Sequence, residues 1–250
     1  MGAVSDILEQ RIASGALTRD PAQMEAALKL DDVLARLRTR GKGGWFSKPK
    51  PAQGLYLWGG VGRGKSMLMD LFYENLNIGR KKRAHFHEFM PDVHARLNVE
   101  RTKELGDPVL PVATALAIEA RFLAFDEMVV NNSADAMIMS RLFTGLVEAG
   151  VTLIATSNRP PVDLYKDGLN REHFLPFIDL LQQRLDVISL NGPTDYRRER
   201  LGGVDLWHVP NGEAATKALS EAFFRLTDYP PEDRAHVPSE DMAVQGGRVM

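Results

Sequence analysis

The segment LYLWGGVGRGKSMLMDLF, residues 55 to 72, constrains the fold more than any other part of the sequence. It contains an apolar run, a glycine-rich stretch and a second apolar run with helical spacing, which is typical of a strand, a tight loop and a helix. From Gly59 to Ser66 it fits the pattern G-x-x-x-x-G-K-[ST], whose backbone N–H groups cradle phosphates. The segment therefore predicts a P-loop for a nucleoside triphosphate. A glycine-rich turn with a surface lysine is the alternative.

The expected phosphate-binding residues are those of the loop and of the first helical turn. Lys65 would neutralise the β and γ phosphates, and the Ser66 hydroxyl would be a ligand of Mg²⁺. The start of a helix at this point adds unpaired N–H groups and a partial positive charge. The nucleotide-binding set is Gly59, Gly60, Val61, Gly62, Arg63, Gly64, Lys65, Ser66 and Met67.

Two adjacent acids follow a second apolar strand. Phe122 to Phe125 run into Asp126 and Glu127, at the carboxyl end of a strand, where ligands of open α/β sheets bind. We expect Asp126 to hold Mg²⁺, usually through water, together with Ser66. Glu127 would orient and polarise the attacking water. The alternative is that both acids cap the next helix.

Three further polar residues are candidates for contact with the γ-phosphate. Asn158 ends another buried strand, and its amide can hydrogen-bond the γ-phosphate or the lytic water without competing for Mg²⁺. Arg171 starts a predicted helix on the far side of the sheet from the P-loop, so it could reach the nucleotide of a neighbouring subunit in a ring. Arg184, just before the last strand, is the competing trans arginine. A turn-forming asparagine and surface salt bridges are the structural alternatives.

Five short apolar segments alternate with helical patterns along the chain. We expect strands at 55–58, 83–89, 121–128, 151–158 and 186–190. This alternation predicts an α/β fold, in which a five-stranded, mainly parallel sheet lies between helices.

The composition of the ends suggests three regions. Residues 1–53 are expected to form a helical segment and a basic Gly/Pro-rich linker, and residues 54–200 the P-loop ATPase core. Residues 201–250 would be an appendage with a strand-like segment, one helix and an irregular tail. Since one helix cannot form a small helical bundle, we expect the C-terminal helical lid to be incomplete or absent.

Charge and cysteine content exclude several classes of protein. The formal net charge of the 250 residues is −2, so no global field favours nucleic acid or an anionic membrane. The chain has no cysteine, which excludes disulfides and Cys-ligated zinc and suits a reducing compartment. No apolar stretch approaches the length of a membrane helix. We therefore expect a cytoplasmic protein without an integral membrane segment.

Several motifs together resemble a known family. The segments GLYLWGGVGRGKSMLMDLFYE, RAHFHEFMPDVHARL, FLAFDE, GVTLIATSNRPP and GLNREHFLPFIDLL are similar to the AAA+ family of the cell-division protein ZapE and the mitochondrial AFG-one-like (lactation-elevated) ATPases. The resemblance spans roughly residues 7 to 200. One departure follows the acids, where DEMVVNNSADAM replaces the commoner DEFQVTDIADAM.

The resemblance implies an ATPase that converts ATP and water to ADP and phosphate with Mg²⁺. Lys65, Ser66, Asp126, Glu127, Asn158 and Arg171 would have the family's roles. It also implies a homo-oligomeric ring and a protein partner, which in bacteria is associated with the division ring and its filament protein. The alternative function is a nucleotide-gated DNA-binding module, similar to a helicase loader. A small-molecule kinase fits the acids less well, because Asp126 and Glu127 suit activation of water.

Two other patterns are given structural interpretations. His85 and His87, with Glu88 nearby, resemble a metal cluster, but no zinc-ligand spacing repeats elsewhere in the sequence. The basic run GRKKR, residues 79 to 83, could bind a phosphate backbone, but such runs on connecting loops are mostly solvated.

Overall fold

The computed structural model describes residues 3–39, 53–103, 106–192, 212–227, 243–244 and 248–249. The chain divides into two compact units, Met1–Thr194 and Asp195–Met250, which are considered separately. Most of the predicted basic linker, including Trp45 and Phe46, lies outside the described residues.

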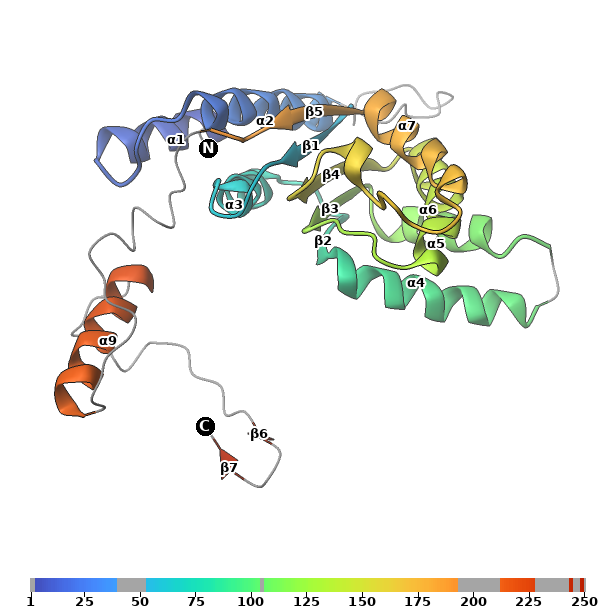
Figure 1. Cartoon of the computed structure of the whole chain (residues 1–250). Coiled ribbons are helices and arrows are strands. Elements are labelled where there is room, and N and C mark those ends of the chain that lie inside the picture. Colours follow the sequence, from blue (N-terminus) through green and yellow to red (C-terminus); the bar gives the residue numbers. More distant parts are fainter. Residues whose placement is uncertain are drawn as a thin grey trace. The chain divides into compact units, whose positions relative to one another are not determined.

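A five-stranded parallel sheet organises the first unit (Figure 1). Its strands in spatial order are β2-β3-β4-β1-β5, and every neighbouring pair is parallel. The predicted α/β class with five parallel strands is therefore confirmed. The strand bounds are β1 (Gly54–Trp58), β2 (Lys81–His85), β3 (Phe122–Asp126), β4 (Thr152–Ser157) and β5 (Leu185–Ser189).

Helices cover both faces of the sheet, as Figure 1 shows. One face carries α1 (Val4–Ala13), α2 (Pro21–Thr39) and α3 (Lys65–Asn75). The other face carries α4 (Phe86–Arg101), α5 (Val109–Glu119), α6 (Ser133–Glu148) and α7 (Leu175–Arg184). The connection from β4 to α7 contains two short 3₁₀ helices, η2 (Pro161–Asp163) and η3 (Arg171–His173). The sheet thus separates two apolar cores.

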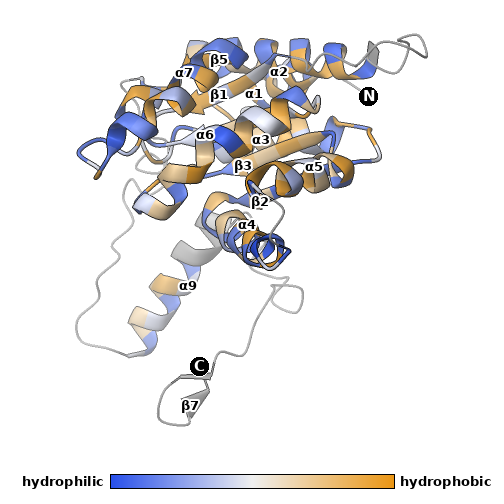
Figure 2. Cartoon of the chain, turned by 90° about the vertical axis from the view of Figure 1, so that its right-hand side faces the viewer, coloured by the Kyte–Doolittle hydropathy of each residue, from blue (hydrophilic) through white to orange (hydrophobic). Residues whose placement is uncertain are grey.

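Successive side chains along a strand point to opposite faces of the sheet, so each strand contributes residues to both cores. In β1, Leu55 and Leu57 pack into the core beneath α2 and α3, whereas Tyr56 packs into the core on the other face. Strands buried on both faces read as continuous apolar runs, which is why their positions were visible in the sequence. The hydropathy colouring of Figure 2 shows β3 as such an apolar strand between helices.

The segment 83–89 differs from its prediction. It was expected to be a strand throughout, but β2 ends at His85 and α4 begins at Phe86. The buried residues of α4 recur at helical spacing, which outweighs the short alternation in HFHEF; they are Phe86, Phe89, Met90, Val93 and Leu97. Consequently His87 lies on a helix, and His85 and His87 are not on one face of a strand.

The basic run at 79–83 is not a solvated loop. Its last three residues belong to β2, an edge strand of the sheet. Arg80 donates to the Ile118 carbonyl, and Lys81 Nζ donates to two carbonyls at the end of α3. Arg83 pairs with carboxylates. Charged residues on an edge strand also discourage pairing with another sheet.

The second unit contains α9 (Glu213–Thr227) and a short antiparallel pair, β6 (Ala243–Val244) and β7 (Arg248–Val249). The predicted helix of this region is therefore present, but the predicted strand-like segment lies outside the described residues. The three predicted regions and the absence of a complete lid stay predictions. Within the ranges that the structure describes, no helix combines the length and the apolarity needed to cross a membrane.

Candidate nucleotide site

The P-loop leaves the centre of the sheet at its carboxyl edge. It follows β1, which lies between β4 and β5. The Gly59 N–H donates to the Ser157 carbonyl at 3.1 Å, and the Leu190 N–H donates to the Trp58 carbonyl at 2.7 Å. The base of the loop is therefore held from both sides by the neighbouring strands.

Backbone geometry explains the glycine that precedes α3. Gly64 has φ = 82°, in the left-handed region that disfavours side chains. A Cβ at Gly64 would also lie 2.7 Å from Nε2 of Gln23. Both restrictions keep the loop backbone bare where α3 begins, as a phosphate cradle requires.

Lys65 fills the loop from within. Its side chain is buried, and Nζ donates 2.7 Å hydrogen bonds to the carbonyls of Gly59 and Gly60. A buried ammonium needs such acceptors, and phosphate oxygens are stronger acceptors than peptide carbonyls. The site thus fits a polyphosphate. When it binds, Lys65 Nζ would give up its hydrogen bonds to the carbonyls and donate to phosphate oxygens instead.

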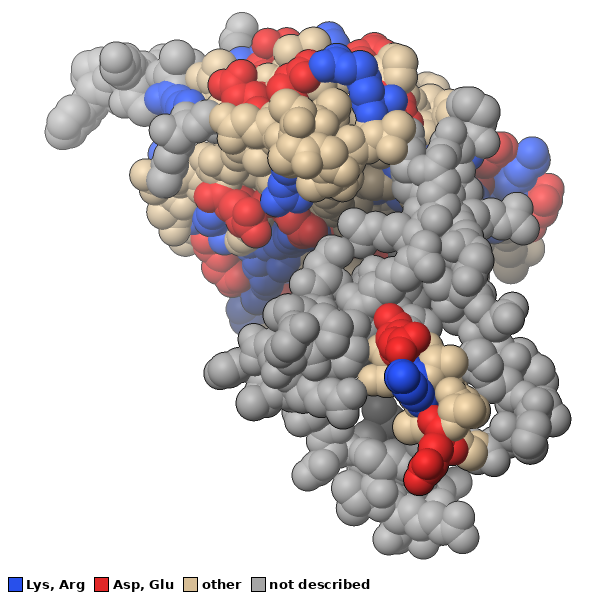
Figure 3. Space-filling view, turned by 90° about the vertical axis from the view of Figure 1, so that its left-hand side faces the viewer, with Lys and Arg blue, Asp and Glu red and all other residues tan. Residues whose placement is uncertain are grey.

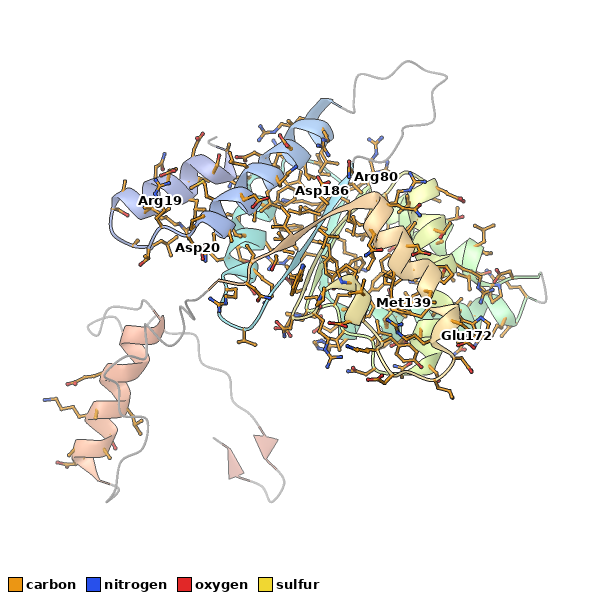
Figure 4. The ribbon with its side chains drawn as sticks, turned by 45° about the horizontal axis from the view of Figure 1, so that its top comes forward. Arg19, Asp20, Arg80, Met139, Glu172 and Asp186 are labelled. Carbon is orange, nitrogen blue, oxygen red and sulfur yellow. The ribbon has the colours of Figure 1, made fainter. Side chains whose placement is uncertain are left out.

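The first turn of α2 supports the loop from below. Asp20, labelled in Figure 4, caps this helix by accepting from the Ala22 N–H at 2.8 Å. Gln23, which is buried, donates from Nε2 to the Arg63 carbonyl at 3.1 Å. Nη1 of Arg63 is buried without a hydrogen-bond partner among the described residues. Sequence reasoning missed Gln23, because its contact spans 40 residues of chain.

Asp126 ends β3 and lies on the α3 face of the sheet, since it alternates with Phe122 and Ala124 of that core. Its side chain is buried, and both carboxylate oxygens accept from Arg83. Arg83 also pairs with Asp70 on α3. Burial lowers the pKa of Arg83, but hydrogen bonds and ion pairs with both carboxylates outweigh it, so the net pKa is raised.

Glu127 is exposed directly after Asp126, and its backbone is strained. Its φ of 53° lies in the left-handed region, which is uncommon for a residue with a side chain. The Glu127 N–H donates to Oγ1 of Thr156 at 3.1 Å, and the Met128 N–H donates to the Thr156 carbonyl at 2.7 Å. The Ser157 hydroxyl donates to the Met128 carbonyl at 2.8 Å. The acid-bearing turn is therefore fixed to the end of β4.

Asn158 follows directly on that strand end and is exposed. The next residue, Arg159, has its carbonyl bound by the Tyr56 hydroxyl at 2.9 Å. Burial raises the pKa of Tyr56, and a hydrogen bond with Ser157 offsets part of the rise. Tyr56 thus remains a donor at neutral pH and anchors the chain beside Asn158.

The two candidate trans arginines lie at opposite ends of the connection from β4 to β5, Arg171 before α7 and Arg184 at its last residue. Arg171 begins η3, not an α-helix, and Nη2 donates to the Val162 carbonyl at 2.6 Å. Its Nε is buried without a hydrogen-bond partner in the part of the chain that the structure describes. Glu172, labelled in Figure 4, follows it in η3. Arg184 ends α7, where the chain enters β5, so it lies at the amino edge of the parallel strands, opposite the P-loop.

The structure thus brings the loop, Asp126, Glu127 and Asn158 to one edge of three adjacent strands, β3, β4 and β1. The Ser66 hydroxyl would be a ligand of Mg²⁺, Asp126 would hold the ion, usually through water, and phosphate and water oxygens would complete the coordination. Among the described residues, no group of three or more His, Asp or Glu side chains is arranged to hold a metal. A metal at this edge would therefore depend on the nucleotide.

Comparison with known protein families gives a match over almost the whole chain. Residues 3–249 match the family described as AFG1-like ATPase. The chain belongs to the AFG1-like ATPase family. The P-loop and the acids at the end of β3 are therefore those of a member of an ATPase family.

Two relatives of the family are similar in sequence. Lactation elevated protein 1 homolog B of Danio rerio is 45% identical over 196 residues, which cover 73% of this chain and 39% of that protein. Cell division protein ZapE of Escherichia coli K12 is 39% identical over 204 residues, covering 80% of this chain and 54% of that protein. The chain thus spans about half or less of these relatives' length.

Solved structures agree on the fold. The crystal structure of DnaI aligns with a TM-score of 0.51 at 16% identity, over 70% of this chain and 88% of that chain. The replication initiator DnaA, bound to AMPPCP and single-stranded DNA, aligns with a TM-score of 0.51 at 14% identity, over 86% and 65% of the two chains. At such identities the likeness concerns the fold alone. The fold that these structures share with this chain is of the P-loop type.

Proposed function

We propose that this chain binds ATP with Mg²⁺ and hydrolyses it to ADP and phosphate. The observation that carries the proposal is the shared edge, where the P-loop, the Asp126–Glu127 turn and Asn158 follow three adjacent strands. Membership of the AFG1-like ATPase family supports the same activity.

Each side chain has a chemical role in this proposal. The loop N–H groups and Lys65 bind the β and γ phosphates. Ser66 and Asp126 would hold Mg²⁺, which when bound neutralises phosphate charge. Glu127 orients the attacking water and accepts its proton, while the Asn158 amide donates to the γ-phosphate or positions the water.

The proposal extends to assembly. We infer a homo-oligomeric ring, in which Arg171 or Arg184 reaches the γ-phosphate of a neighbouring subunit and stabilises charge in the transition state. Arg171 must then release the Val162 carbonyl, whereas Arg184 already has an exposed side chain. ATP hydrolysis would act on a protein partner. The similarity to a cell division protein suggests that this partner is the filament protein of the division ring.

A nucleotide-gated DNA-binding function is less well supported. Three cations of the basic run 79–83, Arg80, Lys81 and Arg83, are each engaged by intramolecular partners. Among the described residues that are visible in Figure 3, acidic and basic side chains are interspersed. A phosphate backbone would require a basic stripe.

Phosphate release tests the activity. We expect phosphate release from ATP that requires Mg²⁺ and needs no acceptor other than water. If a ring forms, the rate of release per subunit should rise with protein concentration. Lys65→Ala should abolish nucleotide binding, whereas Lys217→Ala, on the exposed surface of α9, should change nothing. Tight ATP binding without phosphate release would favour a nucleotide switch. Salt-dependent DNA binding would then favour the loader-like alternative.

A further inference from the structure

Arg83 joins two carboxylates that flank the candidate metal position. Its Nε donates to Oδ2 of Asp126 at 2.6 Å, and its Nη2 donates to Oδ1 of the same residue at 3.2 Å. Nη1 donates to Oδ1 of Asp70 at 2.6 Å. One guanidinium thus holds both oxygens of Asp126 and one oxygen of Asp70.

Sheet register explains why this arginine reaches Asp126. Arg83 pairs with Ala124 across the β2–β3 ladder, and Asp126 lies two residues further along the same face of β3. Residues opposite one another on parallel strands share a face, so the guanidinium extends along the sheet toward the strand end. A planar fork with several donors fits a carboxylate in a way that an ammonium group does not.

The same contact ties Asp126 to the helix that follows the P-loop. Ser66 and Asp70 are four residues apart on α3 and lie on the same side of that helix. Arg83 reaches Asp70, so Asp126 is held beside the turn that carries the Ser66 hydroxyl. Both proposed Mg²⁺ ligands are therefore linked through Arg83.

Burial makes this linkage consequential. The Asp126 residue is only 5% exposed, and a carboxylate removed from water is costly unless it is paired. Without Arg83, Asp126 and Asp70 would both lose the guanidinium that pairs with them. Two carboxylates with one guanidinium carry a net charge of −1, and the same pair alone carries −2.

We propose that Arg83 is a positioning residue for Asp126 and that its charge keeps the site from binding a free divalent cation before the nucleotide arrives. Mg²⁺ would then enter with ATP, whose phosphates supply the missing negative charge. The role rests on the proposed function, because it assumes that Asp126 serves a nucleotide-bound metal. Each carboxylate oxygen retains a lone pair, so Asp126 can accept from a metal-bound water while Arg83 stays in place.

The test measures Mn²⁺ binding to the nucleotide-free protein by electron paramagnetic resonance. The parent should bind Mn²⁺ weakly, and Arg83→Gln, which keeps a donor but removes the charge, should bind it about tenfold more tightly. Arg83→Lys keeps the charge and should remain close to the parent. Arg141→Gln removes one cation on the exposed side of α6 and should also leave Mn²⁺ binding unchanged.

A second pair of variants separates charge from folding. Arg83→Gln combined with Asp70→Asn restores the net charge of −1, so its Mn²⁺ affinity should return to near the parent value. Asp70→Asn alone leaves Arg83 in place and brings the cluster to zero charge, and should weaken Mn²⁺ binding to the ATP complex several-fold. Circular dichroism verifies that each variant is folded.

Positioning is tested with Arg83→Lys. Because an ammonium cannot hold both Asp126 oxygens, this variant should bind ATP normally without metal but gain less affinity from Mg²⁺ than the parent. Equal Mn²⁺ affinities for the parent and Arg83→Gln would overturn the proposal. If Arg83→Gln fails to fold, an unchanged Mn²⁺ affinity of the ATP complex of Asp70→Asn would overturn it. Failure of the parent to bind or hydrolyse ATP would instead refute the proposed function, and the nucleotide-free measurements do not depend on it.

Discussion

Asn191 and Gly60 are joined by a hydrogen bond, in which the Gly60 N–H donates to Oδ1 of Asn191 at 3.0 Å. Asn191 lies just after β5, and Gly60 is the second residue of the P-loop. The contact fixes the near end of the loop to a strand 131 residues away in sequence. Further along the loop, the N–H groups from Gly62 onward are the ones that we expect to face phosphate.

Asn191→Ala should weaken ATP binding by about 2- to 10-fold, the usual worth of one neutral hydrogen bond. Turnover at saturating ATP should change little, because the chemistry lies at the other strands. Fluorescent-nucleotide titration measures the affinity. Asn131→Ala, which changes an exposed asparagine outside the P-loop sequence, is the control. Equal affinity for the Asn191 variant and the parent would show that the contact does not organise the loop.

Glu127→Gln should bind ATP as the parent does while phosphate release falls by about 100-fold or more. The change removes the group that polarises water and leaves Asp126 in place. Glu148→Gln, at the exposed end of α6, is a matched control that should hydrolyse normally. Single-turnover phosphate release separates chemistry from product release. Parent-like turnover in Glu127→Gln would exclude Glu127 as the base.

Thr156→Val should lower turnover without an equal loss of ATP affinity, because the buried hydroxyl that accepts from the Glu127 N–H is removed while the side-chain shape is kept. Thr156→Ser retains the acceptor and should recover most of the activity. The measurements are kcat and KM for both variants. If Thr156→Val and Thr156→Ser have the same kcat and KM, the Thr156 hydroxyl does not position Glu127.

Tyr56→Phe should reduce the free energy of unfolding by about 1 kcal/mol at neutral pH, because the Arg159 carbonyl loses its donor. The raised pKa of Tyr56 adds a pH dependence. Its contribution is complete below the unfolded pKa of about 10 and is lost as pH rises toward the folded value. Denaturant unfolding at pH 8 and above pH 10 should therefore show a smaller alkaline loss in the variant. Parallel pH curves would contradict the assignment.

Mixing tests the trans arginine. Arg171→Ala and Lys65→Ala subunits each lack half of a shared site, so the mixture should recover activity that neither has alone. Co-assembly is verified by size-exclusion chromatography, since Arg171→Ala also removes the contact with Val162. If the subunits co-assemble without recovery, Arg171 acts within its own subunit or only structurally, and Arg184→Ala takes its place in the same experiment.

The three central strands, β1, β3 and β4, were predictable because they are buried on both faces and appear as apolar runs. The P-loop was predictable because a bare, left-handed backbone at Gly64 demands glycine. The α4 helix was missed at HFHEF, where a short alternation hides a longer helical period. Its signal, the buried spacing from Phe86 to Leu97, requires a window that extends past Pro91.

The contacts that organise the candidate site were mostly not predictable. Arg83 looked like part of a solvated basic run, and only the register between β2 and β3 reveals that it faces Asp126. Gln23 and Asn191 meet the P-loop through pairings 40 and 131 residues apart in sequence, for which local patterns carry no signal. The roles of the site residues themselves stay predictions until the variants are measured.

The left-handed backbone of Glu127 lowers the stability of the fold at a position where the proposed function needs a carboxylate. A residue with a side chain at φ = 53° costs roughly 1 kcal/mol relative to glycine. Glu127→Gly should therefore raise the melting temperature, or leave it unchanged after the entropy of glycine is counted, and abolish hydrolysis. A selection for heat resistance alone would drift toward glycine at this position, whereas a selection for ATP consumption would hold glutamate there. Position 127 is thus where the two pressures on this chain diverge.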